Sequence, residues 1–234
     1  NHSINHNNIE DLGLVTEFVQ GTSIIRKGIP YGSAYTYNYL GADPATGQPR
    51  YATADGKETF DVGKAGQFAF GSYLPVHQGG ATLDIRIRAI TISALFSYQF
   101  DVQRYDNTFN WITRGIPGYQ AAVRGAKELL TMQWTKPGDI ARYQSSAYDR
   151  GFTSSDLYDA KFVRFRNLTV SYQIPQIRTS GGTTLIRSSR FYVQAQNLAI
   201  WSPWKGLDPE DNNNISLNEY PNPKYFVVGL DINF

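Results

Sequence analysis

The 234-residue chain has no cysteine and only one methionine and three histidines. Without cysteine, it can form no disulfide, no thiolate nucleophile and no zinc–cysteine centre. No run of 18 apolar residues occurs, so no transmembrane helix is expected. The formal net charge is only +2, which argues against a nucleic-acid partner. The mean hydropathy of −0.39 does not exclude a membrane protein, because a strand of about 9–11 alternating residues can also cross a bilayer.

The residues that usually carry bond chemistry are scattered along the chain. His2, His6 and His77 have no spacing typical of a metal site or a catalytic triad. The acidic stretch 208–211 does not match the spacing by which a calcium-binding loop brings successive oxygens together. We therefore expect no enzyme, no catalytic residue, no metal site and no cofactor.

Tyrosine and phenylalanine are abundant, at 16 and 13 residues, and many lie in stretches where apolar and polar residues alternate. A two-residue period is the pattern of a β-strand with two unlike faces. It occurs at 31–39, 83–88, 90–101, 167–174, 191–196 and 226–234. The second and third stretches predict a hairpin with a tight turn near Arg88–Ala89. The alternation changes phase near Arg166–Asn167, which predicts either a β-bulge or the end of the membrane-spanning part of that strand.

The polar faces of these strands carry mainly Thr, Ser, Gln and Asn, and the apolar faces carry aromatic residues near their ends. Strands that are apolar outside and polar inside, with aromatic girdles, are typical of outer-membrane barrels. The sequence therefore predicts an all-β, antiparallel transmembrane β-barrel, with a soluble β-sandwich or jelly roll as the alternative. The residues expected to face the lumen are Thr91, Ser93, Ser97, Asn167, Thr169, Ser171, Gln173, Tyr192, Gln194, Gln196, Asp231 and Asn233.

Long connections at 41–80, 103–158 and 202–223 contrast with short turns, as in barrels whose long loops lie outside the cell. The C-terminus is then periplasmic. Apolar residues at near-helical spacing predict one short helix at about 118–132, within an extracellular loop.

Aromatic side chains in or beside these loops are the candidates for substrate binding. Their faces can stack on sugar rings or peptide side chains while their polar edges form hydrogen bonds. The alternative is packing within the loops or against a partner protein. The candidates are Trp111, Tyr119, Trp134, Trp201, Trp204 and Tyr220.

Two arginine pairs offer a second kind of contact. Arg86 with Arg88, or Arg164 with Arg166, can bind an anionic substrate. The alternative is that they line a lumen wall and pair with nearby carboxylates such as Asp84.

Five stretches, in this order, resemble motifs of the SusC/RagA-like TonB-dependent transporters. They are YGSAYTYNYLGADPATGQPRY at 31–51, LTMQWTKPGD at 130–139, AKFVRFRNLTVSYQIP at 160–175, VQAQNLAIWSPWKGLDPE at 193–210 and YPNPKYFVVGLDINF at 220–234. The end of the chain also resembles the signal that the barrel-assembly machinery reads on outer-membrane proteins. That signal consists of apolar residues at every second position up to a terminal Phe, here Phe226, Val228, Leu230, Ile232 and Phe234.

The resemblance implies a barrel of about 22 strands with an internal plug domain, embedded in the outer-membrane lipid of a Bacteroidota bacterium. Such a transporter works with a SusD-like surface lipoprotein and takes up oligosaccharides or peptides with energy from the TonB complex. Whether two transporter–lipoprotein pairs form a dimer stays open, as does the choice between glycan and peptide.

The chain departs from this family in its extent. It has no plug, no TonB box and only about seven to nine predicted strands. We therefore expect residues 1–234 to be the C-terminal part of such a barrel, with the plug and the TonB contact upstream. A complete small barrel that acts as a porin, adhesin or structural protein is one alternative, and a soluble glycan-binding β-sandwich is another.

Overall fold

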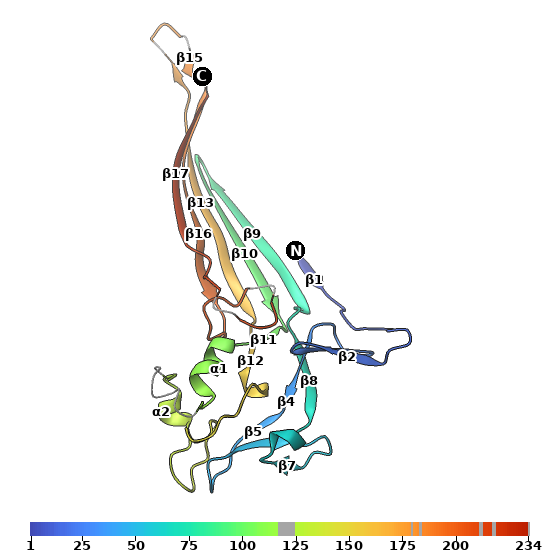
Figure 1. Ribbon diagram of the computed structural model, residues 1–234. Coiled ribbons are helices and arrows are strands. Elements are labelled where there is room, and N and C mark those ends of the chain that lie inside the picture. The colour runs from blue at the N-terminus through green and yellow to red at the C-terminus, as the bar shows by residue number, and fades with distance from the viewer. Residues whose placement is uncertain (117–124, 179, 183, 211–212, 217–218, 234) are drawn as a thin grey trace.

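The computed structural model describes residues 1–116, 125–178, 180–182, 184–210, 213–216 and 219–233. Its main element is a long, six-stranded, antiparallel sheet in the order β1-β9-β10-β13-β16-β17 (Figure 1). The strands are β1 (His2–Ile4), β9 (His77–Ile87), β10 (Ile90–Phe100), β13 (Phe162–Ile174), β16 (Ser188–Trp201) and β17 (Tyr225–Asn233). In the described residues the sheet stays open, because β1 and β17 each pair on one side only.

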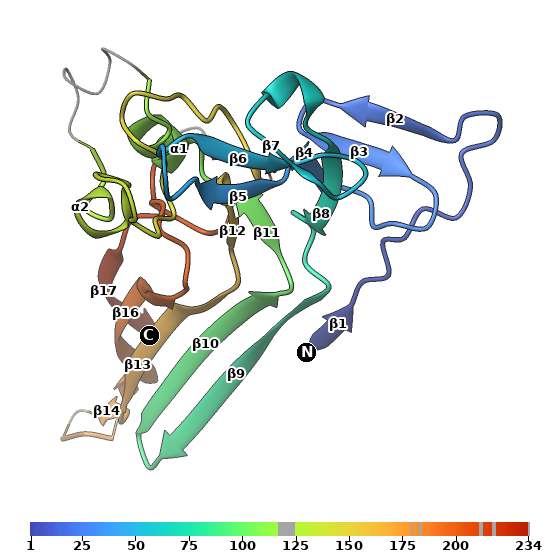
Figure 2. The same ribbon diagram turned by 90° about the horizontal axis from the view of Figure 1, so that it is seen from below.

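The long connections fold into small sheets and short helices, most of which gather at one end of the long sheet (Figures 1 and 2). One sheet contains β2 (Glu17–Gln20), β3 (Ser23–Arg26), β4 (Ser33–Tyr37) and β8 (Gln67–Ser72). Another contains β5 (Tyr39–Ala42), β6 (Pro49–Ala52) and β7 (Glu58–Thr59), and β11 (Gln103–Tyr105) pairs with β12 (Leu157–Asp159). At the opposite end, β14 (Ile177–Arg178) and β15 (Thr184–Ile186) form a hairpin.

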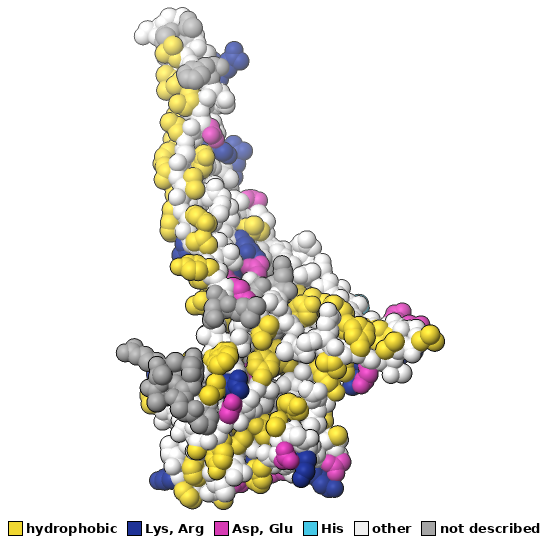
Figure 3. Space-filling model, viewed as in Figure 1, with side chains coloured by type: hydrophobic (Ala, Val, Ile, Leu, Met, Phe, Trp, Pro, Cys, Tyr) yellow, Lys and Arg dark blue, Asp and Glu magenta, His cyan; other side chains and the backbone are white. Residues whose placement is uncertain are grey.

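The register of the long sheet explains why its sequence alternates. Directly paired residues of antiparallel strands point to the same face. Ile92, Val170, Val193 and Val228 are paired across four strands and therefore form one apolar row. Apolar side chains run along this arm of the molecule in Figure 3. Many stay exposed, Val228 by 67% for example, and no second sheet covers this face in the described part of the chain. A β-sandwich would bury such a face.

Two sequence predictions about the strands are confirmed. Ile87 pairs with Ile90, so Arg88 and Ala89 form a two-residue turn, with Arg88 at a positive φ of 55°. The register of β13 shifts between Phe165 and Asn167, so a β-bulge lies where the phase of the alternation changes. Stretch 31–39 does form strands, β4 and β5, but they belong to the small sheets. The described part of the long sheet has six strands, against the seven to nine expected.

The helices differ from the sequence prediction. Residues 118–124 of the helix expected at 118–132 lie outside the described residues, and its described part contains only α2 (Leu129–Met132). No pattern in the sequence predicted α1 (Asn107–Thr113) or the two 3₁₀ turns, η1 (Val62–Lys64) and η2 (Ser154–Asp156). The side chain of Asp106 caps α1 by accepting a 2.8 Å hydrogen bond from the amide of Phe109. None of the described helices is long and apolar enough to cross a membrane.

Candidate functional site

The polar face of the long sheet is continuous over four strands. Thr91, Ser171, Tyr192 and Gly229 form one paired row, and Ser93, Thr169 and Gln194 belong to the row above it. All twelve residues expected to face a lumen lie on this face, and the row of Asn167 and Gln196 also contains Leu95 as an apolar exception. At the far end, Arg190 forms an exposed ion pair of 2.8 Å with Asp231.

At the loop end, this face carries a buried ion cluster. Arg164 forms ion pairs with Asp208 and, at 2.9 Å, with Oε2 of Glu210. Arg166 forms an ion pair with the same Glu210 and donates a 2.7 Å hydrogen bond to the hydroxyl of Ser97. The side chains of Arg164 and Asp208 are only 4% and 9% exposed. The cluster therefore fixes residues 208–210 of loop 202–223 over the polar face of β13. Arg164 and Asp208 are shielded from solvent, whereas Arg166 and Glu210 are 29% and 26% exposed.

The β-bulge in β13 makes this cluster possible. Below the bulge, Asn167 and Thr169 lie on the polar face, so an unbroken strand would place Arg164 on the apolar face. The extra residue reverses the alternation, and Arg164 then pairs with Ser97 on the polar face while Phe165 pairs with Phe96 on the apolar one. The change of phase in the sequence therefore marks the bulge that places Arg164 and Arg166 on the polar face rather than on the apolar face.

Asp208 also closes the loop that it anchors. Its carboxylate accepts hydrogen bonds from the backbone and side-chain nitrogens of Asn222, at 3.3 and 3.2 Å. The two ends of the loop are thus tied together next to β13. Of the acidic stretch 208–211, Asp208 and Glu210 are engaged with arginines and Asp211 lies outside the described residues. The part of the chain that the structure describes contains no cluster of residues that could hold a metal ion.

The arginines of the hairpin behave differently. Arg86, Arg88 and Asp84 take part in no ion pair within the described part of the chain. Arg86 pairs with Thr91 and so lies on the polar face. The expected pairing with carboxylates is found for Arg164 and Arg166, although with residues of a distant loop rather than with Asp84.

A polar groove of about 260 Å³ lies beside the ion cluster. Its walls come from β1, β9, β10 and β13 together with loop 202–223. The polar side chains that line it include Ser3, Gln78, Ser97, Gln99, Arg166 and Glu210. A solute that moves along the polar face would meet hydroxyl, amide and charged groups at this point.

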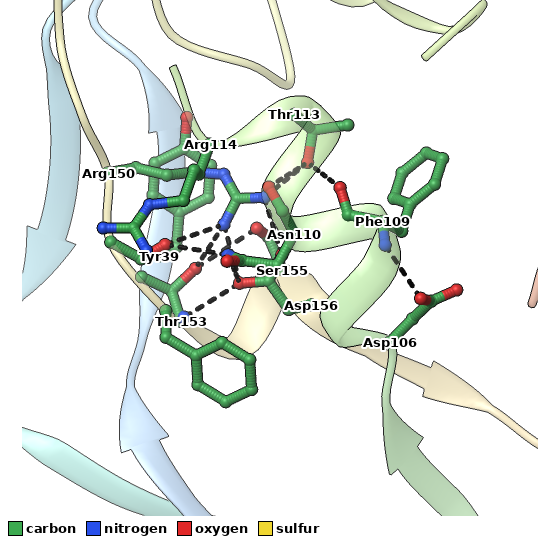
Figure 4. Close-up of polar contacts among 12 residues, drawn as sticks. Tyr39, Asp106, Phe109, Asn110, Thr113, Arg114, Arg150, Thr153, Ser155 and Asp156 are labelled. Atoms are coloured by element: carbon green, nitrogen blue, oxygen red, sulfur yellow. Dashed lines mark hydrogen bonds and ion pairs between the residues drawn. The ribbon is translucent and has the colours of Figure 1, made fainter. Parts of the chain in front are cut away.

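A second buried ion pair holds the loop elements together (Figure 4). The guanidinium of Arg150 forms a two-bond contact with Asp156, at 2.6 and 2.7 Å, and both side chains are fully buried. Thr113 accepts from Arg150 at 2.8 Å, and Asn110 donates to Asp156 at 2.9 Å. Burial alone would lower the pKa of Arg150, but the carboxylate of Asp156 outweighs this and raises the pKa, so the guanidinium stays charged. Because these residues are scattered along the chain, no local pattern predicted this network.

Two of the aromatic candidates are fixed by contacts within the loops. Trp204 is buried against Val102 and Ala160, and the guanidinium of Arg104 lies 5.4 Å from its ring centroid. The indole of Trp134 donates a 3.0 Å hydrogen bond to the carbonyl of Pro44. Both have the surroundings of residues that pack the loops.

The three other candidates that the structure describes are more exposed and lie on different elements. Trp111 is 44% exposed on α1, with the guanidinium of Arg114 5.4 Å from its ring centroid. Trp201 pairs with Val163 on the apolar face of the long sheet, where aromatic girdles of membrane barrels lie. Tyr220 is almost fully exposed, and Tyr119 lies outside the described residues.

Comparisons with known proteins give a consistent result, although no protein-family model matches the chain. The TonB-dependent receptor P3 of Formosa agariphila is 26% identical over 240 residues, which cover 91% of this chain and 23% of that protein. The TonB-dependent receptor SusC of Bacteroides thetaiotaomicron is 29% identical over 131 residues, which cover 55% of this chain and 12% of SusC.

Comparison with solved structures leads to the same group of proteins. The RagAB peptide transporter matches with a TM-score of 0.87 and 25% identity, over all of this chain and 26% of the matched chain. The open-open state of the RagAB peptide importer matches with a TM-score of 0.84 and 24% identity, over 97% of this chain and 25% of that one. The chain thus spans about a quarter or less of the length of these relatives. In sequence and in fold, it is similar to the C-terminal β-barrel portion of SusC/RagA-like TonB-dependent transporters.

Proposed function

We propose that residues 1–234 are the last strands and outer loops of an outer-membrane barrel that imports nutrients. The observation that carries the proposal is the two-faced sheet: exposed apolar rows lie on one side and hydroxyl and amide rows on the other. Lipid requires the first face, and a water-filled passage requires the second. The similarity to the RagAB transporter extends over the whole chain, loops included, which supports the same assignment.

In this function the chain forms part of the barrel wall and catalyses no reaction. The polar rows line the passage, the apolar rows contact outer-membrane lipid, and the ion cluster of Arg164, Arg166, Asp208 and Glu210 holds loop 202–223 beside the mouth. The C-terminus lies in the periplasm, and the alternating residues 226–234 are the segment that the barrel-assembly machinery recognises. Phe234 itself lies outside the described residues.

The remaining parts of the transport cycle belong to a longer protein. A plug domain upstream closes the passage, and the TonB complex supplies the energy to move it. A SusD-like lipoprotein covers the outer mouth, and the substrates are oligosaccharides or peptides. The names of the relatives support this reading, since one is the TonB-dependent receptor SusC and the solved structures are of the RagAB peptide importer.

The assignment of the two faces is tested with cysteines, because the 234 residues contain none of their own. Each matched pair consists of two neighbouring residues on opposite faces. Ser171→Cys on the polar face is compared with Tyr172→Cys on the apolar face, and Thr169→Cys with Val170→Cys in the same way. The full transporter carries one cysteine at a time, after removal of any upstream, and is placed in lipid nanodiscs. A charged maleimide is expected to label the polar-face positions and to leave the apolar-face positions unreacted. Equal labelling of both members of each pair would refute the proposal.

The size of the native protein is an independent check. The chain of 234 residues has a mass of 26.3 kDa. A denatured polypeptide extracted from outer membranes is expected to be several-fold heavier, because it would contain the plug and the other strands. A native polypeptide near 26 kDa would indicate a small barrel and would contradict the proposed import function.

A further inference from the structure

The hairpin of β2 and β3 projects from the loop region on the same side of the molecule as β1 (Figures 1 and 2). Its two strands differ in burial. Ile24 and Ile25 of β3 are 0% and 8% exposed. The residues paired with them, Val19 and Phe18 of β2, are 53% and 46% exposed. Because directly paired residues point to the same face, the burial of both faces of this sheet stops at β2.

The outer edge of β2 also carries unpaired backbone groups. Gln20 pairs with Ser23 across a two-residue turn, in which Gly21 has a positive φ of 60°. The ladder of such a hairpin alternates between hydrogen-bonded and non-hydrogen-bonded pairs and starts with a hydrogen-bonded pair at the turn. Glu17 and Val19 therefore direct their N–H and C=O groups away from β3, towards an edge where the described part of the chain offers no partner strand.

This edge lacks the features by which proteins usually protect an unpaired strand, which are proline, a β-bulge or charged side chains. The four residues of β2 pair with β3 in unbroken register and contain no proline. Their single charge, on Glu17, forms an ion pair of 2.5 Å with Arg26 of β3. Leu14 and Val15, just before β2, are exposed as well, and apolar side chains mark this projection in Figure 3. Such an edge is a template for pairing with a further strand.

We propose that a strand from an outer loop of the upstream part of the same protein pairs with β2 and covers Phe18 and Val19. The relatives are about four times as long as this chain, which resembles their C-terminal portion. Because β1 is an unpaired edge of the long sheet, upstream strands would continue the wall from β1, and their outer connections would emerge on the side of β2. The inference rests on the proposed function, for which it names a contact within the transporter.

The surroundings of the hairpin favour this occupant over lipid and over a separate protein. Asn214 donates hydrogen bonds of 2.8 and 2.9 Å to the hydroxyls of Thr22 and Ser23 at the turn of the hairpin. Asn214 belongs to loop 202–223, which the ion cluster holds over the polar face, so the hairpin lies away from the lipid face. A strand of the same chain has a high effective concentration, whereas a partner that dissociates would leave an aggregation-prone edge exposed.

Hydrogen exchange at single-amide resolution tests whether the edge is paired. The sample is the full-length transporter without its lipoprotein, with one copy in each nanodisc, so that neither the lipoprotein nor a second copy can cover β2. The amides of Glu17 and Val19 are expected to exchange about a hundredfold more slowly than those of an unstructured peptide. Exchange at the unstructured rate would overturn the proposal, as would protection that appears only after the lipoprotein or a second copy is added.

A photo-crosslink identifies the occupant. The substitution Phe18→p-benzoylphenylalanine keeps an aromatic side chain at a position that is already exposed, so it preserves the hairpin. Mass spectrometry is expected to find position 18 joined to a peptide from upstream of Asn1. Phe60, which follows β7 and is 54% exposed, is the matched control and is expected to give no crosslink to that peptide. A crosslink of position 18 only to the lipoprotein, to lipid or to a second copy would overturn the proposal, as would equal upstream yields at the two positions.

This proposal and the proposed function fail in different ways. If β2 exchanges rapidly while the cysteine pairs of the long sheet label as expected, the barrel stands and the pairing of β2 fails. If both members of each cysteine pair label equally, the proposed function fails whether or not the amides of β2 are protected.

Discussion

The ion cluster on β13 allows a quantitative test of what holds loop 202–223 in place. Arg164 is the central residue, because it pairs with both Asp208 and Glu210 and its side chain is only 4% exposed. Replacing it by methionine keeps most of its volume but leaves Asp208 without its arginine and Glu210 with Arg166 alone. Breaking a buried pair from one side costs about 3–5 kcal/mol, mostly because a buried charge loses its counterpart.

This cost should appear as local opening of the loop and not as loss of the barrel. About 3 kcal/mol corresponds to a more than hundredfold increase in the population of the open loop. Hydrogen exchange of the amides in 202–223, measured by mass spectrometry on the full transporter, reports that population. We expect exchange of these amides in Arg164→Met to be at least a hundred times faster than in the wild type, with the amides of β13 and β16 unchanged.

Arg190→Met is the matched control. Arg190 lies on the same polar face and pairs with Asp231, but the two side chains are 52% and 51% exposed. Exposed ion pairs contribute about 0–1 kcal/mol, because water and salt screen them. We therefore expect at most a fivefold local effect near Arg190. If Arg164→Met opens the loop no more than Arg190→Met opens its surroundings, then burial of the cluster does not determine the position of the loop.

Three further variants, one of them a control, test the loop elements. Burial raises the pKa of Asp106 above its usual value, so its contribution to stability is complete at low pH and is lost as pH rises through the raised pKa. Asp106→Asn keeps the capping oxygen and removes the charge. Scanning calorimetry is thus expected to show this variant gaining stability relative to the wild type between pH 4 and pH 7, and an unchanged difference would contradict the buried carboxylate. Gly47→Ala combines a φ of 72° with a Cβ position 2.4 Å from the ring of Trp134 and is expected to cost about 2–3 kcal/mol. Gly56→Ala, with a φ of 83° and open space, is expected to cost only about 1 kcal/mol, and equal thermal shifts would contradict a role for Trp134.

The strands of the long sheet could be predicted from sequence because their faces are set locally. Each side chain alternates with its neighbours, so the rows of Thr91 and Ile92 can be read without knowledge of the partner strands. The bulge was predictable for the same reason. It moves Arg164 to the polar face and Phe165 to the apolar face, and the alternation of apolar and polar residues in the sequence changes phase at this point.

The loops resisted prediction because their contacts are long-range. Arg150 reaches Thr113 across 37 positions, and Asn214 reaches Thr22 across 192, with no periodicity that links them. The alternation at 31–39 identified a strand but not its sheet, since the small sheets of the loops impose the same two-residue period. Trp204 was a candidate for substrate binding, with packing inside the loops as the alternative. Its burial depends on Val102 and Ala160, which lie far from it in the sequence.

The order of the long sheet has a consequence for the evolution of such proteins. β10 and β13 are direct neighbours, although α1, α2, β11 and β12 lie between them in the chain. β10 and β13 can therefore pair whatever the length of the connection between them, because the entropic cost of a longer connection rises only slowly. Insertions and deletions in this connection can therefore change the loops while the pairing of β10 with β13 stays the same.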